Sequence, residues 1–203
     1  MSAVAHSVEI ERKYDVDEAT ALPDWTRLPG ITRVGEPEPR DLDARYLDTP
    51  AAALAHAGIA LRRRAGGPDA GWHVKTPGVD GRHEYHWPLG RDADEGVPAD
   101  IAAAVSPWAT GPFVPLARIR NARVAYALFD ASGAQVAEVV DDHVSARNER
   151  SGGESAWREW EVELGPVPPG DVTAFFAGVD ELVASVGGRP AASTSKLARA
   201  LSA

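Results

Sequence analysis

The side chains of this sequence that suit metal chemistry are carboxylates repeated at every second position. In the segment EWEVEL the alternation places Glu159, Glu161 and Glu163 on one face of a strand. Side chains two apart on a strand lie only about 6–7 Å apart, so these carboxylates repel one another unless water or a cation screens them. Glu9 and Glu11 form a second, shorter row. Oxygen-rich clusters of this type suit hard cations, and we expect Mg²⁺ or Mn²⁺ as the cofactor.

Basic side chains are segregated onto strand faces in the same way. Arg62 and Arg64 share one face, and Arg82 shares another with Glu84. Guanidinium and ammonium groups spread over several strands are what a polyanionic phosphate chain requires. The basic candidates are Arg62, Arg64, Lys75, Arg82, Arg118, Arg120, Arg123 and Lys196. A charged strand face is more often the solvated side of a half-buried sheet, so composition and spacing alone leave open whether these faces line an interior or meet solvent.

The elements that must position these charges are mostly strands joined by tight turns. Alternating patterns and turn signals predict strands over 8–15, 31–38, 41–47, 59–64, 72–75, 82–89, 117–129, 135–148 and 157–164. Capping and periodicity predict helices over 18–28, 51–56, 98–105, 171–186 and 193–201. Eight or more antiparallel strands with helices at the side favour an α+β fold built on a closed or nearly closed β-barrel.

Composition narrows the functional classes. Acidic residues outnumber basic ones by 30 to 21, for a net charge of −9, which argues against a general binder of duplex nucleic acid. The absence of cysteine excludes disulfides, thiol catalysis and cysteine-bound zinc. No apolar run approaches the ~18 residues of a membrane span, and Met1–Ser7 lacks the features of a secretory signal, so we expect a cytoplasmic protein. His83 and His86, three apart on a strand, face opposite ways and make a poor metal pair.

An ordered set of motifs resembles the CYTH family, also called triphosphate tunnel metalloenzymes. The opening VEIERK is similar to the ExExK signature of that family at Glu9, Glu11 and Lys13. Further matches follow in order: ARYLDTP, GIALRRR, WHVKTP, RHEYHWPL, ARIRNAR, VVDDHV, EWEVEL and TSKLARAL. The resemblance covers nearly the whole chain, so we expect one stand-alone CYTH-type domain of a bacterial kind over residues 1–203.

The resemblance implies a tunnel of eight antiparallel strands whose interior binds triphosphate with a divalent metal. By position, it assigns the metal to Glu9, Glu11, Asp142, Glu159, Glu161 and Glu163. It assigns phosphate to Lys13, Arg62, Arg64, Lys75, Arg82, Arg118, Arg120, Arg123 and Lys196, with Glu84 orienting a basic neighbour. Glu161 and Lys13 are the implied catalytic residues, and Lys13 either holds phosphate or helps to activate the water. Asp142 is preferred over the adjacent Asp141 because the family places its aspartate two before a hydrophobic residue, here Val144.

The activity implied by the resemblance is metal-dependent hydrolysis of a phosphoanhydride. Inorganic triphosphate is the favoured substrate because no base-recognition element is evident, while ATP and thiamine triphosphate remain open. Three alternatives are an adenylyl cyclase that makes cyclic AMP from ATP, a non-catalytic polyphosphate or nucleotide-binding module, and a plain β-barrel interaction domain. Product analysis separates the first, and binding without turnover identifies the second.

Overall fold

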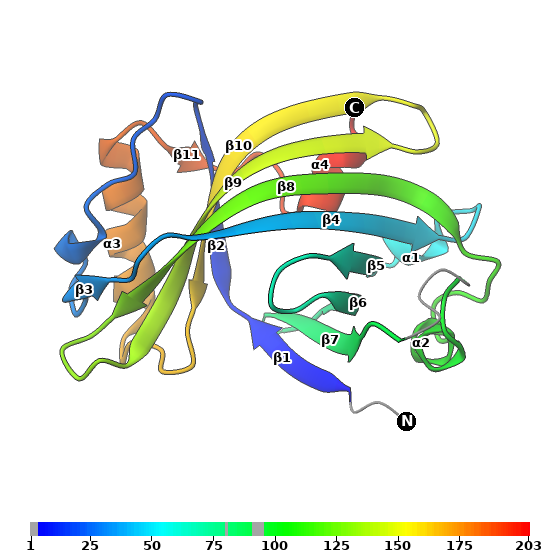
Figure 1. Ribbon diagram of the computed structural model, residues 1–203, viewed down its shortest axis with the longest axis horizontal. Helices are drawn as coiled ribbons and strands as arrows, with labels where there is room; N and C mark the ends of the chain where they lie inside the picture. Colours follow the sequence, from blue (N-terminus) through cyan, green and yellow to red (C-terminus); the bar gives the residue numbers. More distant parts are fainter. Residues whose placement is uncertain (1–3, 80, 91–95) are drawn as a thin grey trace.

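The strands of this protein form one antiparallel sheet. The computed structural model describes residues 4–79, 81–90 and 96–203 (Figure 1). The strands are β1 (Ala5–Glu9), β2 (Glu11–Val16), β3 (Arg33–Val34), β4 (Glu38–Asp48), β5 (Ala60–Ala65), β6 (Gly71–Pro77), β7 (Arg82–Pro88), β8 (Val114–Phe129), β9 (Gln135–Asn148), β10 (Glu154–Leu164) and β11 (Arg189–Pro190). The helices are α1 (Ala53–His56), α2 (Ala99–Val105), α3 (Val172–Ser185) and α4 (Lys196–Leu201), with a 3-10 turn η1 at Trp25–Arg27.

The sheet is strongly curled. Its strand order is β1-β7-β6-β5-β4-β8-β9-β10-β2-β11, with β3 paired to β8. Figure 1 shows the long strands β4, β8, β9 and β10 arching over the shorter strands β5, β6 and β7. Only Ile10 separates β1 from β2, yet β1 pairs with β7 and β2 pairs with β10. The chain itself therefore connects the two ends of the sheet and holds them close together.

This arrangement corrects the expected closed barrel of eight strands. Within the described part of the chain, eleven strands form an open, curled sheet, and no strand ladder joins β1 to β2. The physical reason is that β1 and β2 are successive pieces of one extended segment, interrupted at Ile10, so they do not lie side by side. Each piece instead pairs with a different end of the sheet. The antiparallel sheet with helices at its side agrees with the expected α+β class.

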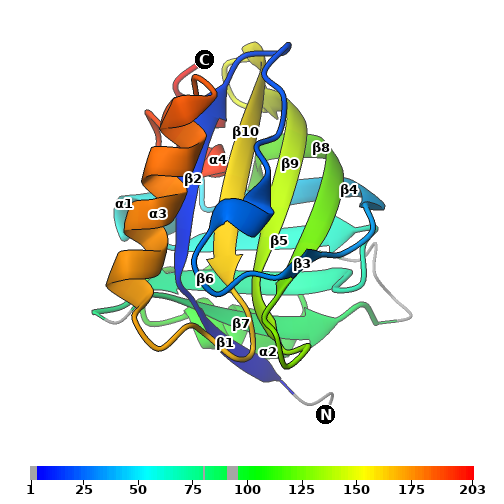
Figure 2. The ribbon, with the colours of Figure 1, turned by 90° about the vertical axis from the view of Figure 1, so that its left-hand side faces the viewer.

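Alternation along the strands sends large apolar side chains to the convex face, where helices cover them. Tyr14 of β2 and Trp160 of β10 are buried beneath α3 together with Phe176 and Val179. Figure 2 shows α3 running along β2 on that face. Burying an aromatic or aliphatic side chain of this size stabilises a fold by about 1.5–3 kcal/mol. Because Tyr14 and Trp160 face α3, their sequence neighbours must face the concave side of the sheet.

Two other helices complete the packing. On the convex side, Ile101 of α2 packs with Trp72 and Trp87 of β6 and β7. On the concave side, Leu197 and Ala200 of α4 pack against apolar residues of β8 and β9. The short helix α4 therefore lies inside the curl, where its side chains can reach the concave face (Figure 1). No helix of the described residues is long and apolar enough to cross a membrane.

The helix predicted over 18–28 is wrong. This segment has only the 3-10 turn η1, which follows Pro23 and is capped by Asp24. Its backbone carbonyls at Asp17, Glu18 and Thr20 accept hydrogen bonds from Nη1 of Arg158, at 3.1, 2.8 and 2.8 Å. The carbonyls of Glu18 and Thr20 thus bind a side chain from a strand, and the Asp17 carbonyl shares Arg158 with a single turn bond from the amide of Thr20 at 3.0 Å. In contrast, the predicted helix over 171–186 is confirmed as α3, with the Asp171 side chain accepting from the amide of Ala174.

Candidate functional site

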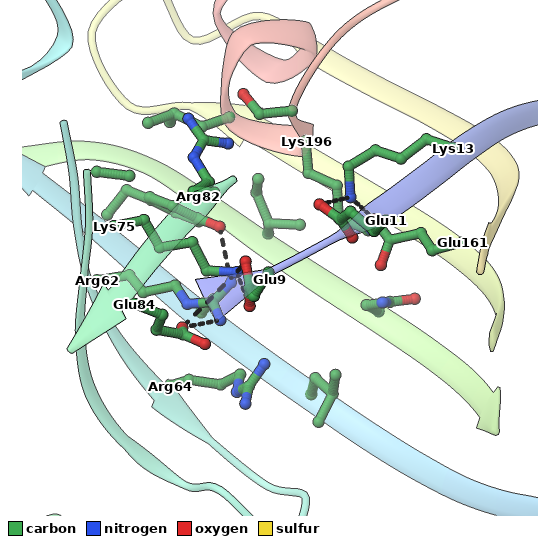
Figure 3. A pocket seen from close by; sticks show the side chains of 18 of the residues that line it. Glu9, Glu11, Lys13, Arg62, Arg64, Lys75, Arg82, Glu84, Glu161 and Lys196 are labelled. Carbon is green, nitrogen blue, oxygen red and sulfur yellow. Dashed lines mark hydrogen bonds and ion pairs between the residues drawn. The ribbon is translucent and has the colours of Figure 1, made fainter. Parts of the chain in front are cut away.

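Charged side chains from many elements converge on a cavity of about 400 Å³ on the concave side of the sheet. Its lining cations are Lys13, Arg40, Arg62, Arg64, Lys75, Arg82, Arg123 and Lys196. Its lining carboxylates are Glu9, Glu11, Asp69, Glu84, Glu138, Glu161 and Glu163. Figure 3 shows two groups of these side chains, one around Glu9 and Glu84 and the other around Glu161. Both groups point into the same space.

The group around Glu161 is organised by Lys196 of α4. The Lys196 ammonium lies 2.8 Å from Asp142, 2.6 Å from Glu159 and 2.7 Å from Glu161. These three carboxylates are all buried, and their nearest oxygens lie within 4.8 Å of one another. Burial alone would lower the pKa of Lys196, but the three carboxylates raise it, so the ammonium stays charged. The α4 helix therefore supplies the positive charge that three buried acids require.

Glu161 also contacts two cations from the sheet. Arg123 of β8 donates from Nη2 to Glu161 at 2.9 Å and makes a two-point contact with Asp142 at 2.8 Å. Lys13 of β2 ion-pairs with Glu161 and lies 2.8 Å from Glu11. Burial opposes ionisation of Glu161, but Lys13, Lys196 and Arg123 hold its pKa well below its usual range. Glu161 is therefore an anion that links three cations.

The second group joins β1 to β6 and β7. The Lys75 ammonium lies 2.6 Å from both carboxylate oxygens of Glu9, and 3.7 Å from Oε1 of Glu84. Burial, and the nearby charge of Glu84, raise the pKa of Glu9 although Lys75 acts against them. Arg62 of β5 donates to the same Glu84 oxygen at 3.2 Å and to the Tyr46 hydroxyl at 3.3 Å. These contacts fix two cations at the cavity wall.

Arg64 is a cation whose charge is poorly compensated. It is buried and ion-pairs with Asp69 of the β5–β6 turn, which is itself half-exposed. Burial and the repulsion of Arg62 and Arg123 lower the pKa of Arg64 to about 9. A guanidinium in this position gains from any further negative charge that enters the cavity.

Glu163 is a carboxylate whose charge is likewise poorly compensated. Within the described part of the chain it makes neither an ion pair nor a hydrogen bond, although it faces the cavity and lies opposite Glu11 across the β10–β2 ladder. Burial, followed by the charges of Glu9 and Glu11, raises the pKa of Glu163 to about 7. A carboxylate held next to like charges without a counter-ion suits a divalent cation, and its oxygen atoms are of the hard type that Mg²⁺ and Mn²⁺ prefer.

The structure brings most of the predicted site residues together. Those that line the cavity are Glu9, Glu11, Lys13, Arg62, Arg64, Lys75, Arg82, Glu84, Arg123, Glu161, Glu163 and Lys196. Asp142 and Glu159 lie buried directly behind them, in contact with Lys196. Asp141 faces the other side of β9, where its carboxylate pairs with Arg158 at 2.8–2.9 Å. Of the two adjacent aspartates, Asp142 is therefore the one at the site.

The placement of Arg118 and Arg120 must be corrected. Neither lines the cavity: both lie on the convex side of β8, where Arg118 pairs with Asp43 and the Arg120 side chain is 62% exposed. The reason is the two-residue period, because Arg123 faces the cavity and residues at an odd spacing from it must face away. Arg123 alone supplies the inward cation of this segment.

Several lining residues were not predicted from the sequence. Arg40 lies at the cavity wall and is bridged to Glu138 at 2.9 and 3.0 Å, and Asp69 pairs with Arg64 from a turn. Glu138 is distant from Arg40 in the sequence and Asp69 lies in a turn, so the two-residue period of a strand finds neither contact. His73, which is buried behind the cavity wall, was not predicted either, although it lies two residues before Lys75 on one strand and must share its face. The two-residue spacing from Lys75 could have indicated that His73 lies near the site.

A curled antiparallel sheet that carries dense, paired charge on its concave face defines the class of domain. Comparison with known proteins gives the family: the CYTH domain matches residues 7–175, and the chain belongs to that family. Two uncharacterized proteins of Mycobacterium tuberculosis are 37% identical to it over 211 residues. The alignment covers 98% of this chain but 41% of each relative, so the chain spans less than half the length of these curated relatives.

Solved structures share the fold at low sequence identity. A candidate adenylate cyclase from Bacillus halodurans has a TM-score of 0.66 at 17% identity, with 96% of this chain and 97% of that chain covered. A candidate adenylyl cyclase from Hippeastrum, described as having a dominant triphosphatase activity, has a TM-score of 0.56 at 17% identity, with 96% and 95% covered. A protein from Pyrococcus horikoshii has a TM-score of 0.54 at 14% identity, with 96% of both chains covered.

Proposed function

We propose that this domain hydrolyses a phosphoanhydride bond of a triphosphate with the help of Mg²⁺ or Mn²⁺, and that its substrate is inorganic triphosphate. The observation that carries the proposal is the convergence, among the described residues, of eight lining cations from six strands and α4 on one cavity of about 400 Å³. A volume in this range is typical of small-molecule sites. Cations fixed around an enclosed space suit a chain of phosphate groups better than any neutral ligand.

The cationic wall has a clear part in such a reaction. Phosphoryl transfer spreads negative charge over the phosphate oxygens, and catalysis consists mainly of positioning and electrostatic stabilisation. Arg62, Arg64, Lys75, Arg82 and Arg123 are placed to supply these charges from several directions. Because they belong to a folded sheet, their charges need no reorganisation when the bond to the leaving group breaks.

Lys13 is best assigned to holding phosphate. Burial would lower its pKa, but Glu161 and Glu11 raise it above its ordinary value. Lys13 therefore stays protonated and cannot accept a proton from water near neutral pH. Of the two roles that the family resemblance leaves open for Lys13, the raised pKa supports this one.

The carboxylates fit a divalent cation. Glu9, Glu11 and Glu163 would hold it, because Glu163 is without a counter-ion among the described residues and its pKa is raised to about 7. Asp142, Glu159 and Glu161 are a second acidic cluster, whose charge Lys196 already compensates. A bound Mg²⁺ or Mn²⁺ supplies neutralisation of phosphate charge and a water of lowered pKa.

Inorganic triphosphate is favoured over ATP and thiamine triphosphate by the character of the wall. Tyr46 is the single aromatic residue among the described residues that line the cavity, and its hydroxyl is held by Arg62. Tyr46 is only 6% exposed, so little of its ring is available for stacking a base or a thiazole. The Hippeastrum structure, described as having a dominant triphosphatase activity, also supports hydrolysis over cyclisation.

The test is a panel of tripolyphosphate, ATP and thiamine triphosphate, each with Mg²⁺, Mn²⁺ or EDTA, with all products identified. We expect orthophosphate from tripolyphosphate. Cyclic AMP and pyrophosphate from ATP would identify a cyclase, and binding without turnover would identify a non-catalytic module.

Three variants locate the activity within the chain. Glu161→Gln should abolish metal-dependent turnover, and Arg64→Ala should mainly raise the KM. Arg120→Ala, on the convex face, is the matched arginine control and should behave as the wild type. Full activity in both Glu161→Gln and Arg64→Ala would contradict the assignment of the cavity.

A further inference from the structure

His73 is a buried side chain that lies directly behind the cationic wall. It is 1% exposed and belongs to β6, two residues before Lys75 and on the same face. Its Nδ1 lies 2.7 Å from Oε1 of Glu84, and its Nε2 lies 3.0 Å from the backbone oxygen of Asp69. The ring also packs against that of His86, with 4.8 Å between the ring centres. The imidazole is therefore packed between Glu84, the Asp69 backbone and the His86 ring.

The protonation of this ring follows from its surroundings. Burial, together with the charges of Arg62 and Arg64, lowers the pKa of His73 to about 3 although Glu84 acts against them. A neutral imidazole carries one N–H, so it donates to one of its two oxygen neighbours. An ionised carboxylate is a stronger acceptor than a backbone carbonyl. We therefore assign the hydrogen to Nδ1, which donates it to Glu84, and Nε2 then faces the Asp69 carbonyl without a hydrogen bond.

One oxygen of Glu84 accepts from two donors and faces a third cation. Oε1 lies 2.7 Å from His73, 3.2 Å from Nη2 of Arg62 and 3.7 Å from the Lys75 ammonium. Burial disfavours the charge of Glu84, but the hydrogen bond with His73 and the charges of Lys75 and Arg62 keep its pKa well below the usual range. Of these three contacts, the one with His73 is the shortest. Unlike Arg62 and Lys75, the neutral His73 ring carries no positive charge that could bind a phosphate.

We propose that His73 is a positioning residue, which fixes the Glu84 carboxylate and thereby sets Arg62 and Lys75 in place for the phosphate chain. Without the ring N–H, Glu84 turns toward its two cationic neighbours and draws them away from the cavity. The proposal rests on the proposed function, because it assumes that these cations hold phosphate. It assigns His73 no contact with the substrate.

The test compares two replacements of similar size. In His73→Asn the side-chain amide can donate from about the position of Nδ1, whereas His73→Leu has no donor. Tripolyphosphate binding is measured by calorimetry, and KM and kcat are measured with Mg²⁺. Since a hydrogen bond to a charged group is lost, we expect His73→Leu to weaken binding and raise KM by about tenfold with kcat changed less than twofold. His73→Asn should restore binding to within about threefold of wild type.

Controls separate this role from a general effect on folding. His143→Leu and His143→Asn change a half-exposed histidine on the convex face and should leave binding unchanged. Circular dichroism and thermal unfolding show whether each variant is folded. Equal affinities of folded His73→Leu and His73→Asn would overturn the proposal. Wild-type protein that neither binds nor cleaves tripolyphosphate would instead refute the proposed function.

A measurement on the ligand-free wild-type protein tests the proposal even if the His73 variants do not fold. Long-range ¹H–¹⁵N NMR spectra of the histidine rings report which nitrogen carries the hydrogen, whether or not a variant folds and whatever the substrate is. Hydrogen on Nδ1 of His73 supports the proposal. Hydrogen on Nε2 alone would overturn it, because the ring would then have no donor to offer Glu84.

Discussion

Replacement of Lys196 by methionine removes the charge that holds three buried carboxylates together. The ammonium lies within 2.8 Å of Asp142, Glu159 and Glu161, and its side chain is 12% exposed. Removing one partner of a buried ion pair typically costs about 3–5 kcal/mol, because it leaves uncompensated charge behind. Arg123 continues to bind Asp142 and Glu161, so we expect the lower end, about 3 kcal/mol near pH 7.

The pH dependence of this loss has a definite sign. The pKa values of Asp142 and Glu161 are held down in the folded protein, opposite to the effect of burial, partly by Lys196. Their contribution to stability is therefore present above the pKa of an unfolded carboxyl, near 4, and is lost as the pH falls. In Lys196→Met the same carboxyls take up protons more readily. The difference in unfolding free energy between the two proteins should thus shrink from pH 7 to pH 4.5.

Urea unfolding at pH 7.5, 6 and 4.5 measures this difference. Arg199→Met is the matched control, because Arg199 lies on the same helix and ion-pairs with Asp15 at a less buried place. We expect the control to lose about 1 kcal/mol or less, with little dependence on pH. A Lys196→Met protein as stable as the control at pH 7.5, or a loss that grows as the pH falls, would refute the reasoning.

Three further outcomes follow from individual contacts. Glu163→Gln should gain about 2 kcal/mol more over wild type at pH 8.5 than at pH 5.5 in urea unfolding, because a pKa raised to about 7 in the folded state makes ionisation costly above the pKa of an unfolded carboxyl. Equal gains at both pH values would contradict this. Arg82→Ala should weaken tripolyphosphate binding several-fold, because the Arg82 guanidinium lines the cavity. The Tm should not change, because this guanidinium has no ion pair among the described residues. Arg118→Ala, on the convex face, should leave binding intact. Arg158→Met should lose about 3 kcal/mol of unfolding free energy in urea, because the Arg158 guanidinium is buried against Asp141 and three backbone carbonyls. The same change should expose the 17–22 segment to protease. Unchanged proteolysis would show that other contacts hold the segment.

The period of two in the sequence predicted which side chains share a face. Glu161 and Lys13 lie opposite each other across the β10–β2 ladder and face the cavity, while Trp160 and Tyr14 face α3. Alternation is a property of the extended backbone itself, so it can be read locally. The direction of a charged face is not local, because it depends on which side of the sheet the helices cover. Arg118 therefore follows the same alternation as the predicted phosphate contacts but lies on the convex side of the sheet.

The features that sequence reasoning missed depend on contacts between distant residues. The carbonyls of Asp17 and Glu18 bind Arg158, which is 140 or more positions away, and this contact replaces the predicted helix. The opening of the sheet depends on where one extended segment breaks, at Ile10, and a smooth alternation through that residue gave no sign of it. The CYTH family resemblance compensated in part, since it assigned residues by position and not by local pattern.

The balance of charge in the cavity determines what must enter with a phosphate chain. In the described ranges of the chain, eight lining cations face seven lining carboxylates, so most of this positive charge is already compensated by acids. A bare triphosphate would add several negative charges next to Glu9, Glu11 and Glu163, which repel it. A divalent cation that enters with the triphosphate removes this repulsion, and by linkage each ligand should strengthen the binding of the other.

Calorimetric titration of tripolyphosphate in EDTA and in Mg²⁺ measures this coupling. We expect binding at least about tenfold tighter with Mg²⁺, corrected for the complex that the two form in solution, and an equal effect of tripolyphosphate on Mg²⁺ affinity. Glu163→Gln should lose most of the gain, because it removes a carboxylate that lacks a counter-ion among the described residues. Equal affinity for tripolyphosphate in EDTA and in Mg²⁺ would contradict this coupling. It would mean that the lining cations exchange their carboxylate partners for phosphate without a metal, and that the lining carboxylates do not bind one.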